Sequence, residues 1–455
     1  MRTKLKWLGL IAVALILMAG LYFLPPVHDR LAWRVDDLRT QIKYFFNPPG
    51  QAVFQPSQQI DFDSILATTR AEYRLTLTPP QATGTPVPTR AGPTLTPTIT
   101  STPLPASVIL KGVKYVDQIG GYNLCGPSNL MMALKFWKWP GTRDEILWAI
   151  KPGVNDPKLE FWKRGQTDKN VMPYEMADFV NDSTDLRAVW RYGGNLKLLK
   201  DFIAAGYPML IEKGEFQLDV NGKISWMGHY QFITGYDDAS QTFLVQDTLP
   251  RVGANAKVKY DQLANEWRAF NYLFMVVYPA DSEEQVNSLL GSWLDEQWAN
   301  QRALTIANED VKNLTGLDLY FAWFNKGTSH VQLQEYFDAA SAYDQAFLLY
   351  PNLPLEKEKL PYRMLWYQTG PYKAYFYSGR YQDVIDLANV TLYQTISEPT
   401  LEESLYWRGM AEQASGNTVA AIADFQAANH LNPKMPAILQ ALQTLGIAPE
   451  TPLKP

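Results

Sequence analysis

The sequence predicts an α+β domain, followed by an all-α array of helical repeats and preceded by a single membrane-spanning helix. Three observations support this fold class. An uncharged apolar run lies close to the N-terminus, short strand and helix patterns alternate through residues 107–280, and small and aromatic residues recur at helical-repeat spacing through 281–450. The 455 residues leave room for two or three domains. The net charge of −5, with no basic block beyond the extreme N-terminus, argues against a nucleic-acid partner.

The first 26 residues predict an uncleaved signal-anchor. Arg2, Lys4 and Lys6 precede an uncharged run of 18 residues, Trp7 to Leu24, which is long enough to span a bilayer. The basic flank predicts a cytoplasmic N-terminus and an extracytoplasmic remainder, in the single-pass topology of a bacterial membrane protein. A cleaved signal peptide is the alternative, but the run ends at Pro25-Pro26 without a small-x-small cleavage site.

Residues 27–75 predict a helical juxtamembrane stalk, and residues 76–106 a linker. The stalk carries an a/d-like series of apolar residues, namely Leu31, Val35, Leu38, Ile42 and Phe45. This pattern fits either an amphipathic helix on the membrane surface or a short coiled coil that makes a weak homodimer through residues 31–45. The linker is dominated by Thr and Pro, which favours an extended chain that spaces the next domain from the membrane.

The one cysteine of the chain, Cys125, has the sequence context of a nucleophile. It precedes the apolar positions Leu130 and Leu134 at helical spacing, so it is expected at the start of a helix. A helix N-terminus and a neighbouring imidazolium both stabilise a thiolate, which is the reactive form. A single thiol also suits an extracytoplasmic enzyme that has no mispairing partner.

His229 and Asp247 supply the remaining parts of a catalytic constellation. The strand patterns 229–236 and 242–247 are joined by a turn-rich segment, and pairing about residue 239 brings 229 opposite roughly 249, close to Asp247. His229 would take the thiol proton, and Asp247 would hold the other ring nitrogen. Gln118, seven residues before the cysteine, can donate its amide to a developing oxyanion. Taken singly, each residue has a purely structural explanation, but together and in this order they favour an active site.

The segment resembles papain-like cysteine peptidases of the bacteriocin-processing type, and more narrowly their stand-alone relatives without a transporter. The resemblance covers roughly residues 107–279 and rests on Gln118…Cys125-Gly-Pro, on Gly228-His229-Tyr230 and on the strand that ends in Asp247. It implies a papain-like fold with Cys125 as nucleophile, His229 as base, Asp247 as orienting acid and Gln118 as oxyanion donor. The motifs are specific for fold and catalytic machinery and not for substrate. The surrounding pattern predicts strands at 189–192, 208–212 and 272–278, a helix at 195–205 and a surface loop at 151–171.

The last third of the chain resembles tetratricopeptide repeats. Two good matches and one weaker copy, at 377–388, carry the pattern, with a capping or connecting helix expected at 284–310. The residues that carry the two good matches are Trp323, Gly327, Ala339, Tyr343, Ala346 and Pro351, then Gly409, Ala421, Phe425, Ala428 and Pro433. Such repeats pack small residues against aromatic ones and present a concave face to a peptide or protein partner. His330, on a turn-like segment, and His430 are interpreted as structural.

The sequence therefore predicts a membrane-anchored cysteine peptidase with repeats that recruit a protein or substrate. Two alternatives stay open. The same triad serves an amidase or acyl transferase, for instance on cell-wall peptides, and a peptidase fold with repeats can also be an inactive peptide-binding scaffold. No Cys/His cluster has zinc-ligand spacing and no glycine-rich loop suits a phosphate, so neither a cofactor nor a metal is expected.

Overall fold

A computed structural model describes residues 103–119, 124–150, 170–218, 224–356, 359–395 and 400–450, with 54–56 and the single residues Gly20, Tyr22, Leu38 and Ile42. The predicted anchor, stalk and linker fall almost wholly outside these ranges, as does the predicted loop 151–171 apart from its last two residues. No helix within the described ranges has the length and apolar character that a bilayer span requires.

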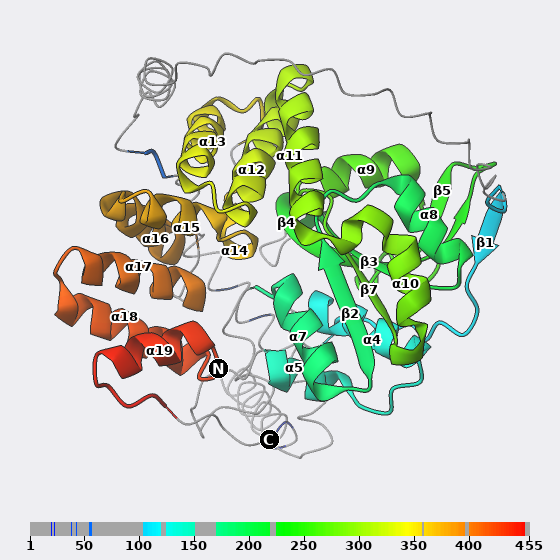
Figure 1. The fold of residues 1–455 in the computed structure, drawn as a ribbon, viewed down its shortest axis with the longest axis horizontal. Helices are drawn as coiled ribbons and strands as arrows, with labels where there is room; N and C mark the ends of the chain where they lie inside the picture. Colours follow the sequence, from blue (N-terminus) through cyan, green and yellow to red (C-terminus); the bar gives the residue numbers. More distant parts are fainter. Residues whose placement is uncertain are drawn as a thin grey trace, which may run out of the picture.

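Residues 103–279, the α/β region, are built on one antiparallel sheet in the order β2-β7-β3-β4-β5-β6, with β1 added beside β4 (Figure 1). The strands are β1 (Ser107–Ile109), β2 (Leu186–Arg191), β3 (Met209–Leu218), β4 (Ile224–Asp237), β5 (Thr242–Gln246), β6 (Ala256–Lys259) and β7 (Phe274–Pro279). The helices are α4 (Cys125–Phe136), α5 (Arg143–Ile150), α7 (Pro173–Ser183), α8 (Leu196–Ala204) and α9 (Tyr260–Arg268). The predicted strands and the 195–205 helix are all present, with β3 and β4 longer than expected.

The sheet separates two apolar cores, because alternate residues of each strand face opposite sides. Helices α4, α5 and α7 cover one face, where Leu130 packs near Leu210 and Phe232. Helices α8 and α9 cover the other face, over Ile211 and Ile233. The long pairing of β3 with β4 runs from Met209↔Ile233 to Leu218↔Ile224 and forms the rigid centre on which the polar residues of the site are carried.

The described part of residues 280–450, the helical region, is mainly helical. They are α10 (Glu283–Leu290), α11 (Glu296–Asn313), α12 (Gly316–Gln332), α13 (Tyr336–Leu349), α14 (Met364–Tyr367), α15 (Gly370–Tyr377), α16 (Tyr381–Gln394), α17 (Glu402–Ala414), α18 (Thr418–Leu431) and α19 (Pro436–Thr444). The single helix expected at 284–310 is wrong: α10 ends at Leu290, and the next residue, Gly291, has a φ of +53° that turns the chain before α11 begins. His330 lies within α12 and not on a turn-like segment.

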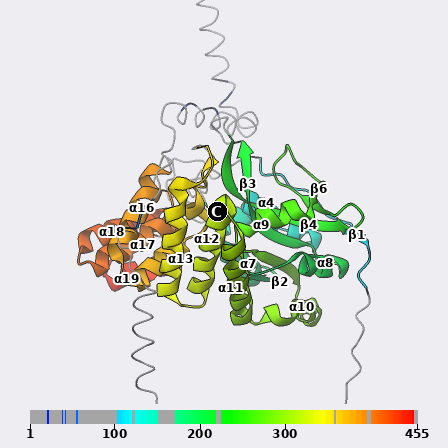
Figure 2. The ribbon, with the colours of Figure 1, turned by 90° about the horizontal axis from the view of Figure 1, so that it is seen from above.

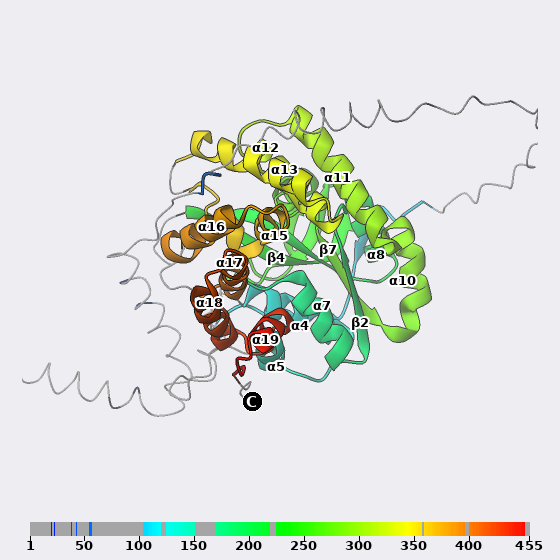
Figure 3. The same cartoon turned by 60° about the vertical axis from the view of Figure 1, so that its left-hand side comes forward.

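The helical region curves around one side of the α/β region (Figures 1 and 3). Helix α11 lies between the sheet and α12 when the molecule is seen from above (Figure 2). At the other end of the curve, Lys434 donates to the carbonyl of Trp148 on α5 over 3.5 Å. Between these points the two regions share a core, in which Trp226 of β4 stacks on Phe270 with ring centroids 6.0 Å apart and also contacts Phe321 of α12. The α/β region and the helical region are therefore packed against each other through a shared core.

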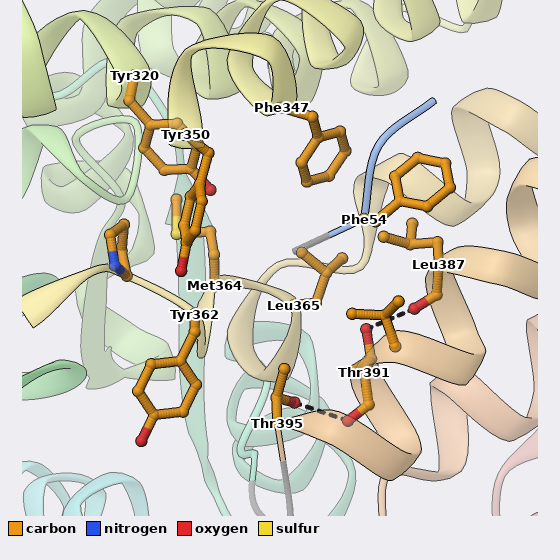
Figure 4. Close-up of a pocket in the computed structure, with 12 residues that line it drawn as sticks. Phe54, Tyr320, Phe347, Tyr350, Tyr362, Met364, Leu365, Leu387, Thr391 and Thr395 are labelled. Carbon is orange, nitrogen blue, oxygen red and sulfur yellow. Dashed lines mark hydrogen bonds between the residues drawn. The ribbon is translucent and has the colours of Figure 1, made fainter. Parts of the chain in front are cut away.

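A short segment of the predicted stalk also packs on the helical region. The ring of Phe54 is buried and lies near Phe347 (Figure 4), with the two ring centroids 5.4 Å apart. The ring centroid of Tyr375 is 5.8 Å from that of Phe54. Gln55 Nε2 donates to the carbonyl of Phe347 over 3.2 Å. The chain is thus held to the helical region upstream of the Thr/Pro-rich segment, a contact that the a/d pattern did not predict.

Candidate active site

Cys125 is the first residue of α4, and the start of that helix is tied to β4. Asn129, one turn further on, donates Nδ2 to the carbonyl of Cys125 over 2.9 Å and to the carbonyl of Tyr230 over 2.8 Å. This side chain bridges the helix and the strand that carries His229. The thiol is free and partly exposed, so it remains accessible at the N-terminal end of the helix.

His229 and Asp247 are in direct contact. Strand β5 pairs with β4 through Ile233↔Val245 and Phe232↔Gln246, and continuing this register brings Asp247 beside the His229 end of β4. The His229 Nε2 to Asp247 Oδ1 distance is 3.1 Å, and the two side chains are only 2% and 1% exposed. Because Nε2 faces the carboxylate, Nδ1 is the ring nitrogen left for Cys125.

The pair favours the imidazolium–carboxylate state. Burial opposes charge on the imidazole, but the Asp247 charge, the hydrogen bonds to Asp247 and Cys125 and the charge of Glu215 raise the pKa of His229 well above its usual range. Burial likewise opposes charge on Asp247, yet the imidazolium charge and the hydrogen bonds from His229 and the Leu249 N–H hold the pKa of Asp247 far below its usual range. A charged imidazolium beside a thiol is the arrangement that stabilises a thiolate.

Two further donors fix the Asp247 carboxylate. Gln231 donates Nε2 to Oδ2 over 2.8 Å, and the backbone N–H of Leu249 donates to Oδ1 over 2.9 Å. Gln231 follows His229 by two residues, so strand alternation carries both side chains on one row of β4. That spacing is the sequence signal that would have identified Gln231, which the motif-based prediction missed.

Gln118 is oriented by a residue that the sequence motifs did not indicate. Thr248 Oγ1 donates to Gln118 Oε1 over 2.7 Å, while the Gln118 N–H donates to the Thr248 carbonyl over 2.9 Å. Since Thr248 occupies the amide oxygen, Nε2 is the end of Gln118 that is left to donate. The preceding carbonyl, that of Asp117, accepts from Ser128 of α4 over 2.9 Å and from Arg143 over 2.8 Å. These bonds fix the Gln118 segment against the start of α4.

Gln118, Cys125 and His229 line one pocket, and Asp247 supports it from behind His229. The structure therefore brings all four residues selected from the sequence to one place. Two other walls of the pocket depend on the helical region. Tyr367, at the end of α14, lies so close to Gly228 that a Cβ there would come within 3.0 Å of its ring. Asn170 of the pocket donates Nδ2 to Glu403 of α17 over 3.0 Å.

Two groups within the described ranges bring enough ligand atoms together for a metal ion. They are Glu215, His229 and Asp247, and His330, Glu335 and Asp338. In the first group Glu215 is engaged by Lys213 over 2.6 Å and also contacts Gln217, while His229 and Asp247 bind each other. In the second, His330 Nδ1 pairs with Glu335 over 2.6 Å. Both imidazoles thus already contact a carboxylate of the protein.

The α/β region combines an antiparallel sheet with Cys125, His229 and Asp247 gathered at one pocket. Residues 110–275 match the model of the Peptidase_C39 like family. No match was found among curated proteins. The α/β region therefore has a C39-like peptidase fold, and the C-terminal part of the chain is helical.

Three solved structures are similar to part of the chain. A structure described as a C39-like peptidase from Bacillus anthracis shares 17% identity over 38% of this chain and 96% of its own, with a TM-score of 0.29. The peptidase domain of Streptococcus ComA, described as a bi-functional ABC transporter involved in quorum sensing, shares 14% over 37% and 98%, with a TM-score of 0.27. Xylellain, a cysteine protease from Xylella fastidiosa, shares 16% over 39% and 87%, with a TM-score of 0.26.

Proposed function

We propose that this chain is a cysteine peptidase that hydrolyses peptide bonds through Cys125, His229 and Asp247, with Gln118 as oxyanion donor. The observation that carries the proposal is the buried His229–Asp247 pair facing a partly exposed thiol at a helix N-terminus. The Asp247 carboxylate is itself held by two further donors. This arrangement suits a base that must carry a positive charge during the reaction.

The geometry gives each group a role in acyl transfer. His229 takes the thiol proton at Nδ1 while Asp247 holds Nε2, and the thiolate attacks the peptide carbonyl carbon. The oxygen that becomes negative is stabilised by Gln118 Nε2 and by the Cys125 backbone N–H. His229 then protonates the leaving amine, and an acyl-enzyme remains on Cys125. Water, deprotonated by His229, hydrolyses this thioester and regenerates the thiol.

The test uses the full chain purified in detergent. Alkylation of Cys125 by iodoacetamide is followed against pH by mass spectrometry, alongside turnover of a mixed peptide substrate pool. Reactivity that persists below about pH 6 in the wild type and is lost in His229→Ala is expected for an imidazolium-stabilised thiolate. Cys125→Ala is expected to abolish turnover while the circular dichroism spectrum is kept. Turnover retained in Cys125→Ala would exclude this mechanism.

Two alternatives are separated by the same material. An amidase or acyl transferase would keep the activated thiol but prefer cell-wall fragments or an acyl acceptor over peptides and water. A non-catalytic scaffold would react with iodoacetamide only as pH rises to about 8 or 9, with no change in His229→Ala. The buried ion pair is the observation that favours catalysis over the scaffold.

We further propose that residues 1–26 anchor the protein in a bacterial cell membrane, with the peptidase at 107–280 outside the cytoplasm. The support is the 18-residue apolar run after Arg2, Lys4 and Lys6. Within the proposed stalk, 27–75, Phe54 contacts Phe347 of the helical region, upstream of the 76–106 linker. The linker length alone would then not set the distance between peptidase and membrane.

Weak dimerisation through residues 31–45 remains part of this proposal. The anchor is tested by carbonate extraction of membranes, which compares the retention of the wild type with that of a chain lacking residues 1–26.

We also propose that residues 281–450 are tetratricopeptide-type repeats that present substrate or a protein partner. In support, a Cβ at Gly327 would meet the ring of Tyr343 at 2.7 Å, and one at Gly409 would meet Phe425 at the same distance. The same small-against-aromatic contact thus joins α12 to α13 and α17 to α18. The contributions of Tyr367 and Glu403 to the pocket walls favour a role in shaping the cleft as well.

A further inference from the structure

The pocket of Cys125 continues into a second pocket between the two regions of the molecule. The second pocket has a volume of about 210 Å³ and lies between β2, β3 and α7 on one side and α12 and residues 367–373 on the other. Glu212 of β3 and Tyr367 line both pockets. A substrate held against the thiol can therefore extend past these two side chains without leaving the protein surface.

The walls of this second pocket are aromatic. The rings come from both regions of the molecule, and Trp190 and Tyr192 meet edge to face with centroids 5.5 Å apart. The aromatic residues that line it are Tyr174, Trp190, Tyr192, Phe270 and Tyr367. Aromatic faces carry negative electrostatic potential, so they attract a cation as well as the methylene chain that bears it.

Glu212 gives the pocket a buried acid for which the described residues supply no cationic partner. Its side chain is 3% exposed, and no ion pair to it is found among the described residues. The neighbouring residue Lys213, by contrast, is paired with both Glu215 and Glu266 over 2.6 Å. Burial raises the pKa of Glu212 well above its usual range, a hydrogen bond with Tyr230 opposes this rise, and the nearby charge of Cys125 adds to it. The carboxylate form thus needs a positive charge that the described part of the chain does not supply.

Lys373 does not fill that role. It lines the pocket on the helical side and is exposed, and it is absent from the groups that shift the pKa of Glu212. Glu212 lies where this pocket meets the pocket of Cys125. A ligand cation that reaches Glu212 exchanges its water shell for aromatic faces and one carboxylate.

We propose that this pocket is a substrate subsite that takes a lysine or arginine side chain of the peptide, next to the bond that Cys125 cleaves. The inference rests on the proposed peptidase function and names the substrate class for it. Glu212 would bind the cation, and the aromatic walls would pack on the methylenes. Tyr367 makes the subsite a joint product of the α/β and helical regions.

The experiment measures labelling of Cys125 in the full chain by short peptidyl chloromethyl ketones. The probes carry lysine, norleucine or glutamate, either next to the reactive ketone or one residue further away. Each labelling rate is divided by the rate with iodoacetamide, which reports the thiol itself. At one of the two positions, lysine is expected to exceed norleucine by about ten-fold or more, as for a charge-assisted hydrogen bond, and glutamate to be slowest.

Variants and controls assign the preference to Glu212. In Glu212→Gln the lysine-to-norleucine ratio is expected to fall close to one. In Glu266→Gln, which removes a charge that lies outside the pocket, the ratio is expected to stay as in the wild type. Equal lysine and norleucine rates at both positions would overturn the inference, even if Glu212→Gln does not fold, and so would a ratio that survives Glu212→Gln. Failure of the peptidase proposal would be visible separately, as slow iodoacetamide labelling unaffected by His229→Ala and no peptide turnover.

Discussion

Two buried carboxyl groups serve the same pocket from neighbouring parts of the sheet, and their environments push them in opposite directions. Asp247 follows β5 and Glu212 lies on β3, with β4 between them. Both are almost fully buried, at 1% and 3% exposure. Yet the pKa of Asp247 is held far below the usual range, and that of Glu212 is raised well above it. Burial is common to both, so the partners decide the protonation state.

The pairing of β3 with β4 explains how such different partners arise side by side. Lys213 lies opposite His229 and Glu212 lies opposite Tyr230, so alternate rows of one strand pair carry the two environments. Asp247 receives an imidazole, an amide and a backbone N–H. Tyr230 donates its own hydroxyl hydrogen to the carbonyl of Val171 over 2.9 Å. No cation is among the groups that set the pKa of Glu212, whereas Asp247 is surrounded by donors and stays charged.

The largest effect is expected from Asp247→Asn, which removes the carboxylate charge and places an amide N–H against the groups that donate to Asp247. Turnover is expected to fall by about 10²- to 10⁴-fold, the range of a general acid–base contribution. Loss of the carboxylate also lowers the pKa of His229, since Asp247 is the charge that raises it. The alkaline limb of the pH–rate profile is therefore expected to move to lower pH. Asp261→Asn, at an exposed site on α9, serves as the matched control, and an unmoved alkaline limb would contradict the assignment.

A smaller loss is expected from Gln118→Ala, because it removes one oxyanion donor and leaves the ion pair intact. The turnover number should fall by about 10²- to 10³-fold with little change in apparent substrate affinity. Iodoacetamide labelling of Cys125 should stay near the wild-type rate, because alkylation develops no oxyanion. A parallel loss of labelling would mean that Gln118 acts through the thiol instead.

Thr248→Val tests how far the orientation of Gln118 matters, because it removes the hydroxyl that donates to Gln118 Oε1 but leaves Gln118 in place. Loss of one hydrogen bond of this kind predicts about a three- to ten-fold decrease in turnover. Combining it with Gln118→Ala is expected to add nothing further, because Thr248 acts through Gln118. Additive losses in this double-mutant cycle would show that Thr248 has a separate role.

The parts of the site that lie close in sequence or on paired strands were predictable, and the parts assembled from distant segments were not. The β4–β5 turn gave the register that joins His229 to Asp247, and apolar spacing gave the start of α4 at Cys125. From the sequence, Glu212 is indistinguishable from any other strand residue. Its pocket is partly lined by Tyr367, which comes from the distant helical region. The contact of Phe54 with Phe347 could not be predicted either, because the sequence around Phe54 does not indicate so distant a partner.

The smallest expected effect is on stability, and here the two carboxyls should differ in sign. A raised native pKa means that the folded protein binds more protons than the unfolded chain above about pH 4.3, so Glu212 lowers stability as pH rises from there toward its own pKa. Glu212→Gln removes this penalty, so it should increase the free energy of unfolding at pH 8 and change it little at pH 4. Asp247 has a lowered native pKa, so its contribution is present above about pH 3.9 and is lost as pH falls toward its native pKa. Asp247→Asn should therefore destabilise at pH 8. Urea unfolding of both variants at the two pH values checks this, and a change of the same sign in both would mean that their partners do not set the difference.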